Sequence, residues 1–175
     1  MKTGLYRLDE FKDNCGFGLI AHLKGQPSHQ LLKTGIEALT CMTHRGGIAA
    51  DGKTGDGCGL LIQKPDAFLR LVAQRDADFQ LSPRYGVGAL MMSRDPEKRA
   101  QAQAVMTEAL ASQGLTDIGW RKLPTDHSCL GPIATSSVPD IYHVFINSDA
   151  ACDHELNAKL FVARRLAEKR LVDDT

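Results

Sequence analysis

A cysteine followed by small residues, Cys15 in the run Asn14, Cys15, Gly16, Phe17, Gly18, is the first candidate for chemistry. If the bond between Asn14 and Cys15 were cut, Cys15 would carry a thiol and a free α-amine, whose pKa near ~8 suits a general base at neutral pH. The amine, directly or through a water molecule, would take the thiol proton, and the thiolate would attack a carboxamide to form a thioester and release ammonia. Water would then hydrolyse the thioester. Nucleophile and base would share one residue.

A simpler interpretation of Cys15 needs no chemistry. Free cysteine is often buried, and Cys15 comes just before an apolar run, so it could be a small core residue at the start of a strand. The sequence pattern alone favours this interpretation. The position of Cys15 does not decide between the two.

The segment from Thr43 to Gly59 holds six glycines among aspartate and threonine residues, which is typical of tight loops. Arg45 stands where a predicted helix ends, so its guanidinium could brace loop carbonyls or a carboxylate, or it could cap the helix through the helix dipole. Asp56 could orient a turn of the loop, and the alternative is an ordinary Asx turn. Both residues would support a site and would not transfer protons.

Three other kinds of site are not indicated. His44 could suggest a Cys–His pair with Cys15, but an N-terminal cysteine carries its own base, and a histidine at a helix end is more often a cap. The six histidines show no HExxH or comparable spacing, so we expect no metal site. Lys53 and Thr54 are adjacent, yet the GxxxxGK[ST] order of a phosphate loop is absent.

The elements expected in the first half are two strands and two helices, arranged as an antiparallel layer covered by helices. Gly16–Leu23 and Cys58–Gln63 are predicted strands. A helix begins after Ser28, a plausible N-cap, and its apolar residues recur about every 3.6 positions up to the Gly46, Gly47 stop. These apolar residues are Leu31, Leu32, Ile36, Leu39 and Met42. A second helix starts with Pro65 at its first position and runs to about Arg75.

The second half predicts a split βαββα unit. The expected elements are a strand at Tyr85–Met92, a helix at Pro96–Gln113, strands at Ile118–Leu123 and Ile141–Asn147, and a helix at Glu155–Leu171. The last helix is amphipathic, with an apolar face that comprises Leu156, Leu160, Val162 and Leu166. A basic run, Arg164, Arg165, Lys169 and Arg170, lies against it.

Composition limits the class of protein. The chain has 175 residues, 43% of them hydrophobic, which suits one soluble globular domain. Lys plus Arg and Asp plus Glu each number 21, so the net charge of zero indicates neither nucleic acid nor a membrane surface as partner. The first 14 residues mix charges of both signs without an apolar run, unlike a secretory signal. Five cysteines without a CxxC pair favour reduced thiols and a cytoplasmic location.

Several segments together carry a resemblance to a known family. Cys15–His22, Met42–Gly47 and Ala50–Gly57 resemble the amino-terminal part of the large (alpha) subunit of glutamate synthase, which is a class II glutamine amidotransferase domain. Gln63–Asp66 and the basic helix at Phe161–Lys169 also fit. The amino-acid sequences of these segments favour glutamate synthase over a class II amidotransferase of a purine or amino-sugar pathway.

The resemblance implies a fold and a site. It implies an α+β fold, an incomplete αββα sandwich of the N-terminal nucleophile hydrolase type. Residues 1–14 would be a leader that is removed, and residues 15–175 the amino-terminal portion of the amidotransferase domain. Cys15 would be the catalytic nucleophile. Structural support of the site would come from Gly16, Arg45, Gly46, Thr54, Gly55, Asp56 and Gly57.

The resemblance also implies partners and cofactors. Glutamine would be the substrate, and its ammonia would serve glutamate synthesis from 2-oxoglutarate, a reductive step. We expect no cofactor in this chain. FMN, an iron–sulfur cluster and NADPH would serve the complete enzyme, whose other partners would be the remainder of the large subunit and a small subunit.

The chain departs from the family in one respect. The later Arg-Phe-Ser-Thr and Asn-Gly-Glu segments, which hold glutamine and form the oxyanion hole, have no counterpart before Thr175. Removing one oxyanion donor typically costs ~10² to 10³ in turnover, so we expect the isolated fragment to be inactive. The alternative is a non-catalytic, truncated domain or interaction module in which Cys15 stays internal.

Overall fold

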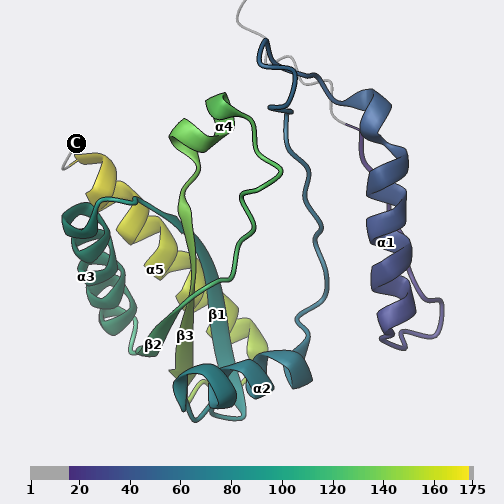
Figure 1. The fold of residues 1–175 in the computed structure, drawn as a ribbon. Coiled ribbons are helices and arrows are strands. Elements are labelled where there is room, and N and C mark those ends of the chain that lie inside the picture. Colours follow the sequence, from purple (N-terminus) through teal and green to yellow (C-terminus); the bar gives the residue numbers. More distant parts are fainter. Residues whose placement is uncertain (1–15, 174–175) are drawn as a thin grey trace, which may run out of the picture. The chain divides into compact units, whose positions relative to one another are not determined.

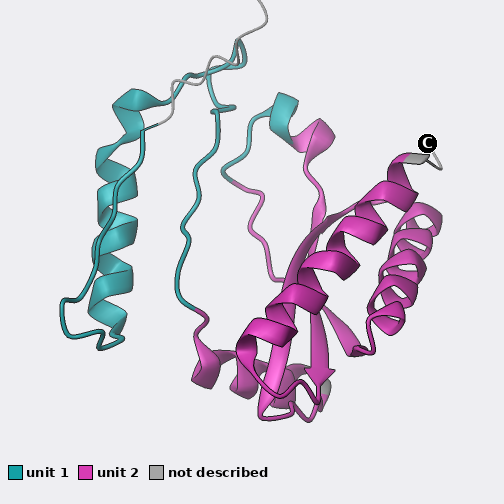
Figure 2. Cartoon of the chain, turned by 180° about the vertical axis from the view of Figure 1, so that it is seen from behind, with its two compact units in different colours: residues 1–63, 129–134 teal, residues 64–128, 135–175 magenta. Residues whose placement is uncertain are grey.

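The computed structural model describes residues 16–173 and divides into two compact units (Figure 2). Unit 1 comprises residues 1–63 and 129–134, and unit 2 comprises residues 64–128 and 135–175. Cys15 and the predicted leader lie outside the described residues. The described elements, in chain order (Figure 1), are α1 His29–Cys41, a 3₁₀ helix at Thr43–Arg45, α2 Asp66–Ala77, β1 Arg84–Met92, α3 Pro96–Ser112, β2 Thr116–Lys122, α4 Pro132–Ser137, β3 Asp140–Ser148 and α5 Asp153–Asp173.

Unit 2 is built on a three-stranded sheet in the order β1-β3-β2. β3 pairs antiparallel with both neighbours, so β1 and β2 run in the same direction on either side of it. Helix α3 connects β1 to β2, and α5 follows β3. This is the predicted split βαββα unit, and each predicted element begins and ends within two residues of its observed bounds. That prediction is confirmed.

One face of the sheet is covered by α3 and α5, which lie side by side (Figure 1). Val144 and Ile146 of β3 are buried there with Leu110 of α3 and with Ala163 and Ala167 of α5. The small alanines allow α5 to approach closely, since neither carries atoms beyond Cβ. The sheet therefore contributes even-numbered residues of β3, Val144 and Ile146, to the core on this face.

The opposite face of the sheet has a second core. Phe145 is fully buried there with Tyr85 of β1 and with Leu69, Val72 and Ala73 of α2. Phe79 packs edge-on against Phe145, with 5.8 Å between ring centroids. Gly119, at φ +153°, is a required glycine, because a Cβ atom at that position would overlap the Phe79 ring.

Polar contacts bind α2 to the strand that follows it. The Tyr85 hydroxyl donates to Asp66 Oδ1 at 2.8 Å, and Arg70 Nε donates to Asp66 Oδ2 at 3.0 Å. Arg70 also donates to the carbonyl oxygens of Leu81, Ser82 and Pro83. Burial, followed by the hydrogen bond to Asp66, raises the pKa of Tyr85 to about 12. The phenol therefore keeps its proton at neutral pH.

The helix starts follow local sequence signals. Ser28 Oγ accepts from the Leu31 backbone N–H at 3.2 Å and caps α1, as predicted. Asp95 Oδ1 accepts from the backbone N–H of Glu97 at 2.8 Å and of Lys98 at 3.4 Å, and Pro96 opens α3. Pro65 is the N-cap of α2 and not its first residue, so the helix begins one residue later than predicted.

The predicted apolar face of α5 is partly wrong. Leu156 is buried, and Leu160 and Leu166 pack against the core, but Val162 is 40% exposed. Ala163 is fully buried on the inner side of the helix instead. Hydrophobicity alone ranks valine above alanine, but the close approach to α3 favours the smaller residue.

The two strands predicted in unit 1 are absent from residues 16–63 of the structure. Both segments are extended and unpaired, and the one bridge in this range joins Ile48 and Gly55. Phe17, Leu19 and Leu61 are at least 90% exposed. A strand needs a paired strand for its backbone N–H and C=O groups, and no described strand pairs with these two segments. The predicted antiparallel layer in the first half is therefore wrong for this structure.

Helix α1 is only half-buried. Its predicted apolar face is intermediate in exposure at Leu31, Leu32, Leu39 and Met42, and Ile36 is 51% exposed. Gly35 is the buried residue, and a Cβ atom on it would lie 3.2 Å from Leu60 Cδ1. The chain is thus of the α+β class, with its apolar core in unit 2.

Candidate functional site

The candidate site residues that the structure describes lie in unit 1, on the glycine-rich loop at residues 46–57 and the residues around it. Inside the loop, the Ala49 N–H donates to the Thr54 carbonyl at 2.7 Å, and the Gly52 N–H donates to the Ala49 carbonyl at 3.0 Å. Gly52, at φ +70°, and Gly57, at φ +85°, adopt a backbone conformation that side chains disfavour. The loop is thus a tight turn closed by its own backbone.

Asp56 spans the base of this loop. Its Oδ2 accepts from the Gly47 backbone N–H at 2.7 Å, nine residues away. A Cβ atom on Gly47 would lie 3.0 Å from the same oxygen, so the glycine allows the carboxylate to come close. The local Asx turn considered for Asp56 is not the bond that forms. The carboxylate ties the two ends of the loop together, as the orienting interpretation predicts.

The Asx turn belongs to Asp51, a residue that the sequence interpretation did not single out. Asp51 Oδ1 accepts from the backbone N–H of Lys53 at 3.0 Å and of Thr54 at 2.8 Å. Asp51 Oδ2 accepts from the Thr54 hydroxyl at 2.6 Å and from the Ile133 N–H at 3.2 Å. These hydrogen bonds hold the pKa of the Asp51 carboxyl far below its usual range, and the bond from the Thr54 hydroxyl is the largest cause.

A second segment, residues 131–134, meets the loop at this point. The Thr54 hydroxyl oxygen accepts from the Ala134 N–H at 3.1 Å. A Cβ atom on Gly131 would overlap Asp51 Oδ2 and would lie 2.6 Å from Thr54 Oγ1, so Gly131 is required by close approach. Gly131 and Thr54 are far apart in the chain, and no local signal in the sequence indicates that they meet.

Gly16 and Arg45 come together at the other side of the loop. A Cβ atom on Gly16 would lie 2.5 Å from Met42 Cε and 3.8 Å from Arg45 Cβ. Arg45 ends the 3₁₀ helix, and the Gly46 N–H donates to the Thr43 carbonyl at 3.2 Å. The chain next to Cys15 therefore passes the arginine that was predicted to support the site.

The remaining predicted support residues are placed by the same loop. Gly55 forms the bridge with Ile48, and Gly57 follows Asp56 with its positive φ. His44 Nδ1 lies 3.1 Å from the Cys41 carbonyl oxygen, which agrees with a cap at the end of α1. Cys15 itself lies outside the described residues, so its role as nucleophile stays a prediction.

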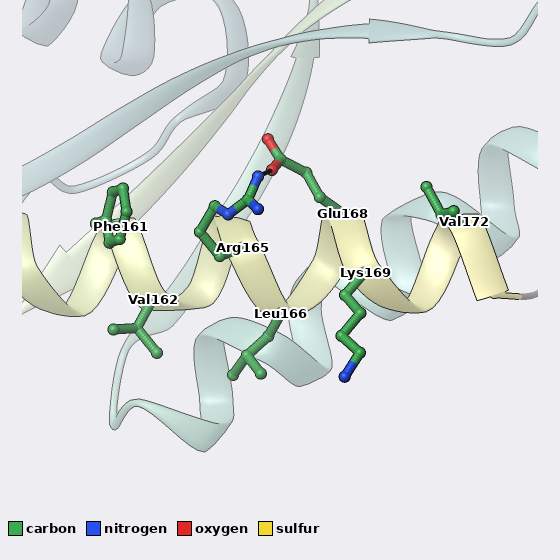
Figure 3. A pocket seen from close by; sticks show the side chains of 7 residues that line it. All are labelled: Phe161, Val162, Arg165, Leu166, Glu168, Lys169 and Val172. Atoms are coloured by element: carbon green, nitrogen blue, oxygen red, sulfur yellow. Dashed lines mark hydrogen bonds and ion pairs between the residues drawn. The ribbon is translucent and has the colours of Figure 1, made fainter.

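Other features of the described part of the chain are separate from this loop. An open hollow on α5 is lined by Phe161, Val162, Arg165, Leu166, Glu168, Lys169 and Val172 (Figure 3), none of which is a predicted site residue. Residues 16–173 contain no group of three or more metal-ligating side chains. Four cysteines in this range, Cys41, Cys58, Cys129 and Cys152, are exposed. No helix in this range is long and apolar enough to span a membrane.

Comparison with known proteins identifies the family. Residues 15–175 match the family described as glutamine amidotransferases class-II, and the chain belongs to this family. The chain is 38% identical over 167 residues to the glutamate synthase [NADPH] large chain of Bacillus subtilis, with 94% of this chain and 11% of that protein aligned. It is 35% identical over 169 residues to ferredoxin-dependent glutamate synthase 2 of Synechocystis, with 95% of this chain and 11% of that protein aligned.

These relatives confirm the resemblance to an amidotransferase domain of glutamate synthase that the motifs predicted. The chain spans about a tenth of the length of these curated relatives. The family match begins at Cys15, the residue predicted as nucleophile, and leaves out the predicted leader.

Proposed function

We propose that this chain carries the glutaminase nucleophile of a glutamate synthase, with Cys15 as its first residue after removal of residues 1–14. The observation that carries the proposal is that the family match starts at Cys15. The placement of Gly16 beside Met42 and Arg45 supports it, because the backbone that continues from Cys15 passes the 3₁₀ helix that leads into the glycine-rich loop.

The proposed reaction proceeds in two steps. The Cys15 α-amine accepts the thiol proton, and the thiolate attacks the side-chain carboxamide carbon of glutamine. The C–N bond then breaks, the nitrogen leaves as ammonia with the transferred proton, and a thioester remains on Cys15. Water, deprotonated by the same amine, attacks the thioester, so that glutamate and the free thiol are released.

Support for the site comes from residues that shape the backbone. Arg45, Gly46, Thr54, Gly55, Asp56 and Gly57 belong to the loop or flank it, and their hydrogen bonds hold its turn. Their proposed role is to keep the backbone near Cys15 in one conformation, which matters because a small misplacement of reacting groups lowers the rate strongly. No proton is assigned to them.

For the complete protein, we propose a wider reaction. Ammonia from the glutaminase passes to an imine derived from 2-oxoglutarate, which is then reduced. The names of the relatives indicate electron donors of two kinds, NADPH and ferredoxin. FMN and an iron–sulfur cluster, bound outside residues 1–175, and a small subunit complete this proposal, with the cytoplasm as its location.

We also propose that the extended segments at 16–23 and 58–63 are strands of an αββα sandwich in the complete domain. Their exposed apolar side chains, such as Phe17, Leu19 and Leu61, support this proposal, because such residues are more often covered in a finished core. A direct test is the measurement of amide hydrogen exchange in the two segments, in the complete gene product and in residues 1–175 alone. Slow exchange in both segments of the complete protein is expected, and fast exchange there would contradict the sandwich.

The first experiment on function is the intact mass of the protein expressed from its complete open reading frame. Loss of residues 1–14 is expected. The variants Cys15→Ala and Cys15→Ser should then lower ammonia release from glutamine by about 10³-fold or more, because each removes the thiolate. Cys152→Ser is the matched control, an exposed cysteine in unit 2 that should keep wild-type activity.

Two results would contradict the proposal: a leader that remains on an active enzyme, or full activity in Cys15→Ala. The polypeptide of residues 1–175 alone should release ammonia at no more than the background rate. Measurable turnover by that polypeptide would show that the further segments of the family are dispensable.

A further inference from the structure

The contact between the glycine-rich loop and residues 131–134 has features of a built clamp. Two backbone N–H groups of the second segment are donors: the Ile133 N–H donates to Asp51 Oδ2, and the Ala134 N–H donates to the Thr54 hydroxyl oxygen. Gly131 fits against the same pair because it lacks a Cβ atom. We refer to Asp51, Thr54 and the backbone of residues 131–134 as the Asp51 clamp.

We propose that Asp51 is a positioning residue of the glutaminase site, and that the Asp51 clamp holds the glycine-rich loop in its working conformation. The proposal rests on the proposed function. It adds a residue and a second chain segment, 131–134, to a site that the motifs placed wholly before residue 58.

The route from the clamp to the candidate nucleophile runs through successive short contacts. Asp51 fixes the backbone and the hydroxyl of Thr54, and the Thr54 carbonyl accepts from Ala49 at 2.7 Å beside the Ile48–Gly55 bridge. Asp56 then joins the far end of the loop to Gly47. Because Gly47 follows Arg45 by two residues, the clamp restrains the backbone against which Gly16 lies.

The charge of Asp51 is what the clamp requires. Both carboxylate oxygens accept two hydrogen bonds each, and an ionised carboxylate is a pure acceptor. An asparagine can present its oxygen to Lys53 and Thr54, but its NH₂ group would then face two donors, the Thr54 hydroxyl and the Ile133 N–H. Asp51→Asn therefore breaks the hydrogen bond from Ile133, one of the two bonds to residues 131–134, and leaves the Asx turn in place.

Four variants of the complete gene product separate this role from general stability. Asp51→Asn and Thr54→Val each remove part of the clamp, and Thr54→Ser keeps the hydroxyl as the conservative rescue. Asp95→Asn is the matched control, because Asp95 accepts its two backbone hydrogen bonds through Oδ1 alone and lies in unit 2. Asparagine preserves such a cap.

Two readouts are measured on each variant. Amide hydrogen exchange, resolved by peptides that cover residues 46–57 and 129–137, reports the clamp itself. The kcat and KM for glutamine hydrolysis report its effect on the site. Thermal unfolding is followed in parallel to detect a general loss of fold.

We expect Asp51→Asn and Thr54→Val to speed exchange in both peptides about tenfold and to lower kcat by about 10- to 100-fold, with KM changed less than about threefold. Thr54→Ser and Asp95→Asn should resemble wild type. Unchanged exchange in Asp51→Asn would show that the clamp does not form. Faster exchange with unchanged kcat would show that the clamp is structural only. Absence of glutaminase activity in the processed wild type would instead overturn the proposed function, and the positioning role with it, while the exchange data would still report the clamp.

Discussion

Unit 1 and unit 2 are each stabilised internally by a different kind of interaction. Every buried hydrophobic residue that the structure describes belongs to unit 2, which is coloured magenta in Figure 2, and all except Met92 belong to its two core clusters. The residues that are buried in the described part of unit 1 are glycines, Gly35 and Gly131. Its loop is held by hydrogen bonds to Asp51, Thr54 and Asp56, which are part-buried or exposed.

The difference shows that global stability and the predicted site residues belong to different units of this chain. Burial of apolar surface is the dominant favourable term in folding, so unit 2 supplies most of the stability. Unit 1 carries all the predicted site residues and depends on backbone geometry at a few glycines. Substitutions should accordingly fall into two groups, those that change global unfolding and those that change local order.

The largest expected effect is on the core of unit 2. Phe145→Ala removes a side chain that is fully buried between the sheet and α2, and should lower the free energy of unfolding by about 3–5 kcal/mol. Urea denaturation of the polypeptide of residues 1–175 measures this loss. Phe17→Ala in unit 1, where the side chain is 94% exposed, should change it by less than about 0.5 kcal/mol. Equal losses for the two variants would refute the contrast between the units.

A smaller effect is expected where β2 bulges past Phe79. Gly119→Ala adds a Cβ atom that overlaps the Phe79 ring, at a residue whose φ of +153° disfavours any side chain. The combined strain and overpacking should destabilise the protein by about 2–4 kcal/mol. Gly59→Ala, with no atom within 4 Å of its Cβ position, is the control in unit 1 and should unfold like wild type. A stable Gly119→Ala would mean that Phe79 can move aside.

A third prediction concerns the buried hydroxyl of Tyr85. Tyr85→Phe keeps the ring but removes the hydrogen bond to Asp66, and should cost about 1–2 kcal/mol. Arg70 continues to bind the Asp66 carboxylate, so no charge is left without a partner. Urea denaturation at pH 7 gives the value, and a variant as stable as wild type would show that the bond contributes no net stability.

The same tyrosine predicts an alkaline pH dependence. Its pKa in the folded protein, about 12, lies above its ordinary value near 10, so the folded state holds the phenol proton more tightly than the unfolded chain. Stability should therefore fall as the pH rises from about 10 towards about 12. Tyr85→Phe should lack this part of the fall, and parallel curves for the two proteins would contradict the raised pKa.

The smallest effect is expected at the start of α1. Ser28→Ala removes the acceptor for the Leu31 N–H and should destabilise the helix by about 1 kcal/mol. Since α1 belongs to the weakly packed unit 1, the loss should speed amide exchange within residues 29–41 and leave exchange in β3 unchanged. Ser28→Asp retains an acceptor and should restore slow exchange. A simultaneous change in β3 would mean that the units unfold together.

Much of unit 2 was predictable because its signals are local or periodic. Asp95 followed by Pro96 indicates a helix start through bonds that span three residues, and the apolar run in Tyr85–Met92 indicates a strand. The strands predicted at 16–23 and 58–63 have similar apolar runs but no paired strand in the described residues. A pattern of side chains indicates that a segment can form a β-strand, but it does not identify the strand with which that segment pairs.

The candidate site divides in the same way. Cys15, Arg45 and Asp56 were predicted from motifs, and the hydrogen bond from Gly47 to Asp56 agrees with the orienting role predicted for that carboxylate. The Asp51 clamp was missed because Asp51 and Ile133 are 82 residues apart, and their bond leaves no local mark in the sequence.

The sequence by itself determined the family and the positions of α1, α2, α3 and α5, and it indicated the candidate nucleophile, whereas the short helix α4 was not predicted. Those features depend on contacts within a few residues or on motifs that survive without a fold. Only the tertiary structure decided that Ala163 is buried while Val162 is exposed, that Gly119 accommodates Phe79, and that Gly131 lies on Asp51. Each of these is a close approach between segments distant in sequence, and the space left for a side chain exists only after the chain has folded.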